Sequence, residues 1–367
     1  MEFIIGFILI FGVIRLSVAF CNWISQPYLP KSASSKFQPS ISILIPVRNE
    51  EKNIEKLLSD LERITYQQLE IIVYNDCSTD NTGEILKKYS KKLHNLKIME
   101  GQTLPEGWLG KNHACYNLAN AAKNDHLLFI DADVRLENGL IEDALAYLVN
   151  NKLSLLSIFP KQLMPNYRTR LAVPLMNWIL LSLLPLLLVK ISKLTSFSAA
   201  NGQFMLFNAF NYKQLEPHNH FKNNKVEDIA IIMHFKSKKL KVCTLLGDNK
   251  ISCTMYTQLK EAINGFSKNI FQFFGGSVII TFSFVAITSL SPFILLFFST
   301  PLITTLYLSI ILLIRIFVSL VSKQSVWKNI LLILPQQCIL ILIVCKAFNQ
   351  KKNKKMIWKD RNILSEN

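Results

Sequence analysis

The sequence predicts an α/β domain with a mostly parallel β-sheet, preceded by one membrane helix and followed by several more. Between residues 40 and 160, short apolar runs alternate with helical stretches, as strands and crossover helices do. Long apolar runs with few charges occupy the first 25 residues and most of the chain after Phe274. Half of the 367 residues are hydrophobic and the mean hydropathy is +0.27, which fits this mixture better than a wholly soluble protein.

The first apolar run, Phe3 to Phe20, is interrupted only by Arg15 and is just long enough for a membrane helix. A cleaved signal peptide is the alternative. Against it, Glu2 stands where a basic residue is expected, and the bulky Phe20 stands where cleavage needs a small side chain. We therefore expect an uncleaved anchor over residues 1–25, and a proline- and serine-rich linker over residues 26–39.

Five short apolar runs predict the strands of a sheet within a domain that spans residues 40–269. Helical stretches lie between the first four runs, among them Glu50 to Arg63 and Thr82 to Tyr89. Strands that alternate with crossover helices are typical of a parallel sheet, and ligands bind beyond the carboxyl ends of such strands. The five runs are Ile41 to Ile45, Glu70 to Tyr74, Leu96 to Met99, His126 to Ile130 and Leu153 to Ile158.

Residues 270–348 contain three more apolar segments, in which Arg315 is the only charged residue. They predict C-terminal membrane segments, followed by a basic tail over residues 349–367. The segments are Val278 to Phe298, Leu302 to Val321 and Ile330 to Cys345. A further apolar stretch, 171–191, lies between two motifs that are expected below to share one site. Since one crossing would separate those motifs, we expect this stretch to lie in the membrane interface or to fold back.

The charges beside these segments predict a multi-pass protein of the cell membrane, with the 40–269 domain in the cytosol. Lys31 and Lys36 follow the first helix closely, and basic flanks of this kind stay inside. The tail is also basic, so three full C-terminal crossings would place it on the wrong side. We therefore expect residues 330–345 to form a re-entrant hairpin that breaks at Pro335-Gln336-Gln337. The tail charges are Lys351, Lys352, Lys354, Lys355, Lys359 and Arg361, against Asp360 and Glu366.

The formal net charge of +16 does not indicate a nucleic-acid partner, because the lysines are scattered or flank apolar segments without interleaved aromatic residues. Anionic lipid headgroups and phosphorylated substrates explain this charge better. The seven cysteines are odd in number and include no Cys-x-x-Cys pair, which argues against a disulfide framework or a zinc site.

Asp131 and Asp133 directly follow the apolar run that ends at Ile130. Side chains two residues apart at a strand end point the same way, so both carboxylates can reach one hard divalent cation. Such a cation would neutralise a diphosphate leaving group. The alternative is that Asp-x-Asp is only a common turn sequence.

Two earlier strands also end in polar residues. Asn75-Asp76-Cys77-Ser78-Thr79-Asp80 follows the second run, where Asp76 can accept hydrogen bonds from a nucleobase or ribose and Asp80 can cap a helix. Pro46-Val47-Arg48-Asn49-Glu50 follows the first run. Three strands therefore present polar side chains at one edge of the predicted sheet.

These three motifs, in this order and spacing, resemble those of the family 2 glycosyltransferases, which have the Rossmann-like GT-A fold. The loop Gly107 to Cys115 resembles the corresponding loop of a membrane-bound branch that includes the carotenoid acid glycosyltransferases. The resemblance implies an inverting transferase that uses a nucleotide-diphosphate sugar, with UDP as the expected nucleotide and Mn²⁺ or Mg²⁺ at Asp131 and Asp133. The donor-binding residues that it implies are Pro46, Arg48, Glu50, Asp76, Lys111 and Asp131.

Lys111 offers a point charge for phosphate, and the glycines around it permit close approach of the backbone. A solvated lysine at a helix start is the plainer interpretation. Lys268 presents a similar choice, between contact with the donor diphosphate and contact with lipid headgroups.

An acceptor hydroxyl must lose a proton as it attacks the sugar, so a general base is needed. Glu227 and Asp228 begin an apolar helix and could merely complement its dipole. The family resemblance implies that the second acid, Asp228, is the base. It also suggests acceptor-side positions for Gln203, Glu227 and His218, of which His218 could equally be an ordinary loop residue.

The favoured hypothesis is a non-processive transferase that acts on a lipid-like acceptor at the membrane. Processive relatives carry a Gln-x-x-Arg-Trp element, and none follows Asp228. The alternatives are a processive polysaccharide synthase and a catalytically inactive membrane protein that binds nucleotide-sugar.

Overall fold

The computed structural model describes residues 1–31, 38–353, 357–358 and 361–362. The chain forms two compact units, which are described separately. The helical unit comprises Met1–Gln26, Met164–Leu187 and the described residues from Met255 to Asn353. The sheet unit contains Pro27–Leu163 and Leu188–Thr254.

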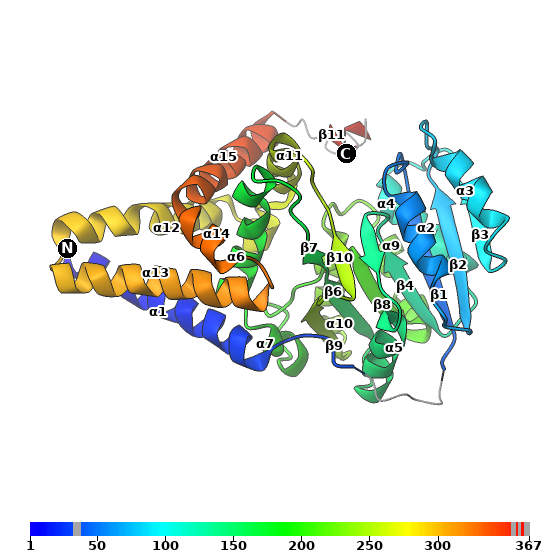
Figure 1. The fold of residues 1–367 in the computed structure, drawn as a ribbon, viewed down its shortest axis with the longest axis horizontal. Coiled ribbons are helices and arrows are strands. Elements are labelled where there is room, and N and C mark those ends of the chain that lie inside the picture. Colours follow the sequence, from blue (N-terminus) through cyan, green and yellow to red (C-terminus); the bar gives the residue numbers. More distant parts are fainter. Residues whose placement is uncertain (32–37, 354–356, 359–360, 363–367) are drawn as a thin grey trace. The chain divides into compact units, whose positions relative to one another are not determined.

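The sheet unit is built on a seven-stranded sheet in the order β3-β2-β1-β4-β8-β6-β9 (Figure 1). The strands β3, β2, β1 and β4 run parallel to one another, whereas β8 runs antiparallel to both β4 and β6. This mostly parallel arrangement confirms the predicted α/β class. The strands are β1 (Ile41–Val47), β2 (Leu69–Asn75), β3 (Leu96–Glu100), β4 (His126–Ile130), β6 (Leu155–Phe159), β8 (Phe204–Asn208) and β9 (Val242–Leu246).

Helices pack on this sheet through apolar residues spaced by three and four positions. In α2 (Ile54–Glu62), Ile54, Leu57, Leu58 and Leu61 are buried, and each contributes roughly 1.5–3 kcal/mol by leaving water. The other helices of the domain are α3 (Thr82–Ser90), α4 (Gly110–Ala121), α5 (Leu140–Asn150), α8 (Ala209–Leu215), α9 (Pro217–His220) and α10 (Glu227–Ser237). A small second sheet contains β5 (Val134–Leu136), β10 (Ile251–Cys253) and β7 (Lys161–Gln162).

Backbone hydrogen bonds hold together the carboxyl ends of β1, β2 and β3. The amide of Asp76 donates to the Val47 carbonyl at 2.8 Å, and the amide of Gly101 donates to the Asn75 carbonyl at 2.8 Å. Asn49 and Cys77, just beyond these ends, adopt positive φ angles of 52° and 49°. Left-handed backbone at non-glycine residues is costly and often marks functional loops. This edge of the sheet therefore has a tightly fixed and locally strained backbone.

The helical unit contains four helices that are long and apolar enough to cross a membrane (Figure 1). This finding confirms the expected N-terminal helix and the C-terminal apolar helices. They are α1 (Glu2–Ser25), α12 (Val278–Phe298), α13 (Pro301–Val321) and α15 (Ile333–Lys352). Shorter elements are η1 (Thr169–Leu171), α6 (Val173–Leu183), α11 (Leu259–Asn269), η2 (Gln272–Phe274) and α14 (Val326–Leu331).

The apolar stretch 171–191 forms two short helices, α6 and α7 (Leu186–Ile191), instead of one long helix. With 11 residues, α6 is too short to span a bilayer. Asn22 of α1 fixes the end of α6, because its side chain donates to the carbonyls of Leu181 and Leu184, each at 2.9 Å.

The chain after α13 folds back along that helix. Asn329 of α14 donates to the Ser319 hydroxyl at 2.9 Å, and the Gln336 side chain accepts from Arg315 at 2.7 Å. The later residue, Gln336, thus contacts an earlier position of α13 than Asn329 does, so the two segments run in opposite directions. Gln337 then donates to Thr288 and Ser289, which lie in the middle of α12.

From Gln337 onward, α15 returns toward the start of α12. The Phe348 ring packs edge-on against Phe282, with centroids 5.7 Å apart. Near the end of α15, Gln350 accepts from the Ser267 hydroxyl of α11 at 3.2 Å. Both ends of the α14–α15 segment thus lie at the same end of the α12–α13 pair, as in a re-entrant hairpin.

The position of the helix break was predicted wrongly. It lies at Leu332, between α14 and α15, and not at Pro335-Gln336-Gln337. Pro335 is the third residue of α15, where its missing N–H would have no partner within the helix in any case. Several charges used to predict topology, namely Lys36, Lys354, Lys355, Lys359, Asp360 and Glu366, lie outside the described residues.

We predict that the end of α15 is cytosolic. In a variant free of native cysteines, Asn353→Cys should remain unlabelled by an impermeant thiol reagent in intact cells, and should react after permeabilisation. Thr300→Cys, in the turn between α12 and α13, is the matched control and should react in intact cells. Strong labelling at position 353 in intact cells would rule out the re-entrant topology.

Candidate active site

The candidate site lies at the carboxyl edge of the parallel strands, where Asp131 and Asp133 follow β4. The backbone amide of Asp131 donates to the Gln203 carbonyl at 3.3 Å, and the amide of Val134 donates to the Asp131 carbonyl at 3.2 Å. The first bond ties the aspartate motif to the segment before β8, and the second closes the turn that carries both carboxylates.

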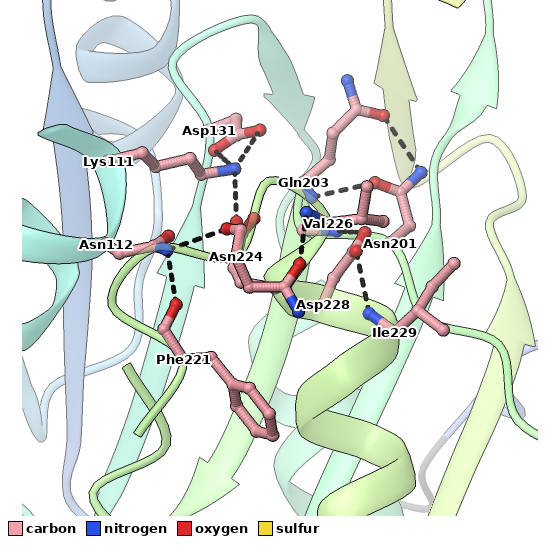
Figure 2. Close-up of polar contacts among 12 residues, drawn as sticks. Lys111, Asn112, Asp131, Asn201, Gln203, Phe221, Asn224, Val226, Asp228 and Ile229 are labelled. Carbon is pink, nitrogen blue, oxygen red and sulfur yellow. Dashed lines mark hydrogen bonds and ion pairs between the residues drawn. The ribbon is translucent and has the colours of Figure 1, made fainter. Parts of the chain in front are cut away.

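Lys111, in the first turn of α4, points into this edge between two acids (Figure 2). Its Nζ lies 3.0 Å from Asp131 Oδ1 and 3.4 Å from Glu227 Oε1. Burial alone would lower the pKa of Lys111, but the charges of Asp131 and Glu227 outweigh burial and hold that pKa well above its usual value. The lysine is therefore a fixed cation that joins α4, β4 and α10.

Gly202 leaves the space that the Lys111 ammonium group needs. A Cβ at Gly202 would lie 3.1 Å from Lys111 Nζ and 3.6 Å from Glu227 Oε1. The Gly202 amide also donates to Asp228 Oδ2 at 3.0 Å. A side chain at position 202 would therefore crowd the contact between the lysine and the two acids of α10.

Asp133 and Gln203 form the second part of this edge. Gln203 Nε2 lies 3.3 Å from each carboxylate oxygen of Asp133 and 2.8 Å from Cys253 Sγ. Burial, together with the charge of Asp131, raises the pKa of Asp133 to about 6. The structure thus places Gln203, expected near the acceptor, against the aspartate motif.

Asp228, in the first turn of α10, accepts two backbone hydrogen bonds: the one from Gly202 and one from its neighbour Ile229 at 2.8 Å (Figure 2). Burial, and then the charge of Glu227, raise the pKa of Asp228 to about 7. A general base works best when its pKa lies near the operating pH. The proton affinity of Asp228 therefore suits the exchange of a proton near neutral pH.

Asn112 was not singled out by the sequence analysis, and it anchors the loop before Glu227. Its buried side-chain amide donates to the carbonyls of Phe221 at 2.8 Å, Asn224 at 2.9 Å and Lys222 at 3.2 Å. The backbone amide of Leu109 adds a bond to Lys222 at 2.8 Å. The sequence carried only a weak signal for this role. An asparagine side chain tends to bond to backbone groups and is unfavourable inside a helix, but the sequence does not show which backbone groups it will reach.

Arg48 and Asp76, two of the predicted donor-binding residues, are brought together at the ends of β1 and β2. Arg48 Nη1 donates to the Asp76 carbonyl at 2.7 Å and lies 3.8 Å from its carboxylate. The Glu50 amide donates to the Thr82 hydroxyl at 2.8 Å, so Glu50 is fixed at the start of α3. Pro46 lies within β1, paired with Tyr74 of β2. Pro46, Arg48, Glu50 and Asp76 thus share one sheet edge with Asp131.

Two further predicted site residues are His218, in the sheet unit, and Lys268, in the helical unit. His218 is buried, with Nδ1 2.6 Å from the Tyr212 hydroxyl and its ring 4.9 Å from that of Phe129. Burial, and then the charge of Lys111, lower the pKa of His218 to about 3, so it stays neutral. Lys268 belongs to α11 of the helical unit, and its contact with the donor stays a prediction.

Residues 42–211 match the family model described as glycosyl transferase family 2. Over this stretch the chain is similar to the family 2 glycosyl transferases. This stretch contains every motif from Pro46 to Gln203, whereas His218, Glu227 and Asp228 lie beyond it. The assignment of the Glu227–Asp228 pair therefore depends on its geometry beside Lys111.

Two curated relatives are similar to the chain. The 4,4'-diaponeurosporenoate glycosyltransferase of Staphylococcus haemolyticus (strain JCSC1435) is 30% identical over 244 residues, which cover 65% of this chain and 63% of the relative. The protein of the same name from Staphylococcus aureus (strain bovine RF122 / ET3-1) is 38% identical over 114 residues, covering 30% and 28%. The chain thus matches less than two thirds of the length of either relative.

A solved structure shares the fold over nearly the whole chain. The mannosyltransferase PcManGT from Pyrobaculum calidifontis, in complex with GDP-Man and Mn²⁺, superposes with a TM-score of 0.55 at 13% identity. The match covers 95% of this chain and 99% of that one. The sheet unit therefore has the GT-A fold that the motifs implied.

We predict that Asn112→Ala loosens the loop over residues 221–226, because three backbone carbonyls lose their donor. A buried hydrogen-bonding group that loses its partner costs about 1–3 kcal/mol. Amide hydrogen exchange of this loop should therefore accelerate by roughly 10- to 100-fold. Asn117→Ala is the matched control, since Asn117 lies on the same helix and its backbone bond goes to His113 of that helix. Equal exchange in the two variants would contradict the anchoring role.

Proposed function

We propose that the chain is a membrane-bound glycosyltransferase that transfers a sugar from a nucleotide-diphosphate donor to a lipid-like acceptor. One observation carries this proposal: Lys111 joins the aspartate motif after β4 to the acids of α10, at the ligand-binding edge of a family 2 domain. The name of the Staphylococcus haemolyticus relative, a transferase for a carotenoid acid, supports an apolar acceptor. The four long apolar helices support a site beside a bilayer.

The candidate site contains more acidic than basic side chains, which favours binding of a divalent cation. Asp131, Asp133, Glu227 and Asp228 bring four carboxyl groups to one edge, and Lys111 is the cation that contacts two of them. Among the described residues, no cluster of three or more His, Cys, Asp or Glu side chains is arranged to hold a metal alone. We therefore infer that Asp131 and Asp133 hold Mn²⁺ or Mg²⁺ together with donor diphosphate oxygens. The bound ion would stabilise the charge that develops on the leaving diphosphate.

The protein's own residues divide the remaining tasks. Arg48 and Asp76 lie where the nucleoside would bind, and Asp228 takes the proton of an acceptor hydroxyl. Because burial keeps the pKa of Asp228 near 7, the group can accept a proton at neutral pH and release it after transfer. With single displacement at the sugar carbon, the bond to the acceptor oxygen forms as the bond to the diphosphate breaks. Asp228 receives the proton, and the sugar configuration inverts.

We predict that Asp131→Asn and Asp133→Asn abolish turnover and Mn²⁺ binding. Loss of a cation that stabilises the leaving group by several kcal/mol should lower the rate at least about 100-fold. Calorimetric titration of Mn²⁺ in the presence of a nucleoside diphosphate gives a readout independent of activity. Asp125→Asn, just before the opposite end of β4, is the control and should change neither result. Full activity in a chelator-treated preparation would refute the metal.

The Asp228→Asn variant should slow transfer roughly 100-fold or more, with nucleoside diphosphate affinity unchanged. A base must be deprotonated, so the kcat/KM of the unaltered protein should rise with pH and level off above about 7. The variant should lack this rise. A fall in donor affinity as large as the fall in rate would move Asp228 from the acceptor side to the donor site.

A further inference from the structure

Two arginines are buried inside the helical unit, and both pack against the ring of one tryptophan. Arg15 of α1 is 5% exposed and Arg315 of α13 is 3% exposed. The guanidinium carbon of each lies 4.4 Å from the ring centroid of Trp178 in α6. Cation–π contact of this kind offsets part of the cost of burial, but the two like charges remain in one apolar bundle.

Neither arginine is paired with an acid among the helices that surround it. Arg15 donates twice to the Ser182 hydroxyl, at 3.2 and 2.8 Å, and Arg315 donates to Gln336 at 2.7 Å. Among the residues that the structure describes, the buried Nε of Arg315 has no hydrogen-bond partner. Across α1, α6, α12, α13, α14 and α15 the only acidic residue is Glu2, roughly 20 Å from Arg15 along a helix that rises 1.5 Å per residue.

A cavity of about 90 Å³ adjoins both arginines. Its polar wall consists of the two guanidinium groups with Gln337 and the hydroxyl residues Thr288 and Ser289. Its apolar wall includes Phe293 and Leu334, which are 56% and 72% exposed on the outside of the bundle. The lining of the cavity is therefore mainly apolar, with both arginines among its residues and with Phe293 and Leu334 reaching the outside of the bundle.

Pro292 adds to the polar character of this wall. It lies inside α12 and has no backbone N–H, so the Thr288 carbonyl lacks its usual helical donor. The side chain of Gln337 donates to the hydroxyls of Thr288 and Ser289 at 3.0 and 2.7 Å. These bonds join α15 to α12 beside the cavity.

Uncompensated charge at this depth is expensive, and ionisable groups within membrane helices usually mark a ligand or a partner. Guanidinium groups form short, strong hydrogen bonds to carboxylate and phosphate oxygens. We propose that this cavity binds the anionic group of a membrane lipid, a phosphate or a carboxylate, between Arg15 and Arg315. The lipid chain would leave the bundle past Phe293 and Leu334. The inference requires that the helices lie in a membrane, but not that the protein is a transferase.

The experiment uses the full chain, purified and delipidated in a neutral detergent, with its melting temperature as the readout. Phosphatidylglycerol and oleate provide a lipid phosphate and a lipid carboxylate, phosphatidylcholine provides a zwitterionic lipid, and inorganic phosphate provides a free anion. At least one anionic lipid should raise the melting temperature in a saturable way, as ligands of the native state do. Phosphatidylcholine and inorganic phosphate should not.

Arg315→Gln should weaken the apparent affinity for the anionic lipid at least about 10-fold, since a charge-assisted hydrogen bond is worth roughly 1.5–3 kcal/mol. Arg168→Gln is the matched control, because Arg168 is an exposed arginine of the same unit. Gln337→Glu guards against misfolding of the first variant. The new carboxylate would place a negative charge beside the two arginines without any lipid. It should therefore stabilise the lipid-free protein and abolish the response to lipid.

Three results would overturn the proposal. The first is an equal response to phosphatidylcholine, or no response to either anionic lipid. The second is an equal response to inorganic phosphate, which would show a site for a soluble anion. The third is an unchanged lipid response in both Arg315→Gln and Gln337→Glu, which would show that the arginines serve only to pack the helices.

Discussion

The ion pairs of Lys111 with Asp131 and Glu227 hold together the parts of the sheet unit that matter for function. Three elements far apart in the sequence, α4, the end of β4 and the start of α10, meet at this ammonium group. Without its charge, four carboxyl groups would crowd one edge of the sheet. Gly202 is small enough to admit the lysine, and Asn112, its neighbour in α4, fixes the loop that leads to Glu227.

The parallel part of the sheet could be predicted because its apolar runs and polar ends alternate in chain order. Pro46, Asp76 and Asp131 were placed together on that basis. The insertion of β8 between β4 and β6 could not be predicted, since antiparallel pairing between segments this far apart in the sequence leaves no local signal. This insertion puts Gln203, just before β8, beside Asp133, and its acceptor-side role stays a prediction. Asn112 escaped notice because its partners are backbone carbonyls, which have no sequence signature.

The helical unit shows the same division between local and distant determinants. Apolar length was enough to locate α1, α12 and α13, but the break after α14 was assigned to Pro335 when it falls at Leu332. Proline disrupts a helix only beyond its first turn, so its effect depends on where the helix begins. The charged residues within the apolar runs, Arg15 and Arg315, were noted only as interruptions. Both arginines contact Trp178 only when α1, α6 and α13 pack together, and the sequence of a single segment does not show this.

The shared lysine also means that the two halves of the candidate site cannot be charged independently. Lys111 lowers the pKa of Asp228, and Glu227 raises it. Any group that neutralises Asp131 lets Lys111 interact more fully with Glu227. The Glu227 carboxylate then repels the Asp228 carboxylate less, so the pKa of Asp228 falls. The charge at Asp131 and the proton affinity of Asp228 are therefore linked through one ammonium group. An acceptor that arrives as a carboxylate has no proton to lose and would bypass this link, whereas a hydroxyl acceptor would depend on it fully.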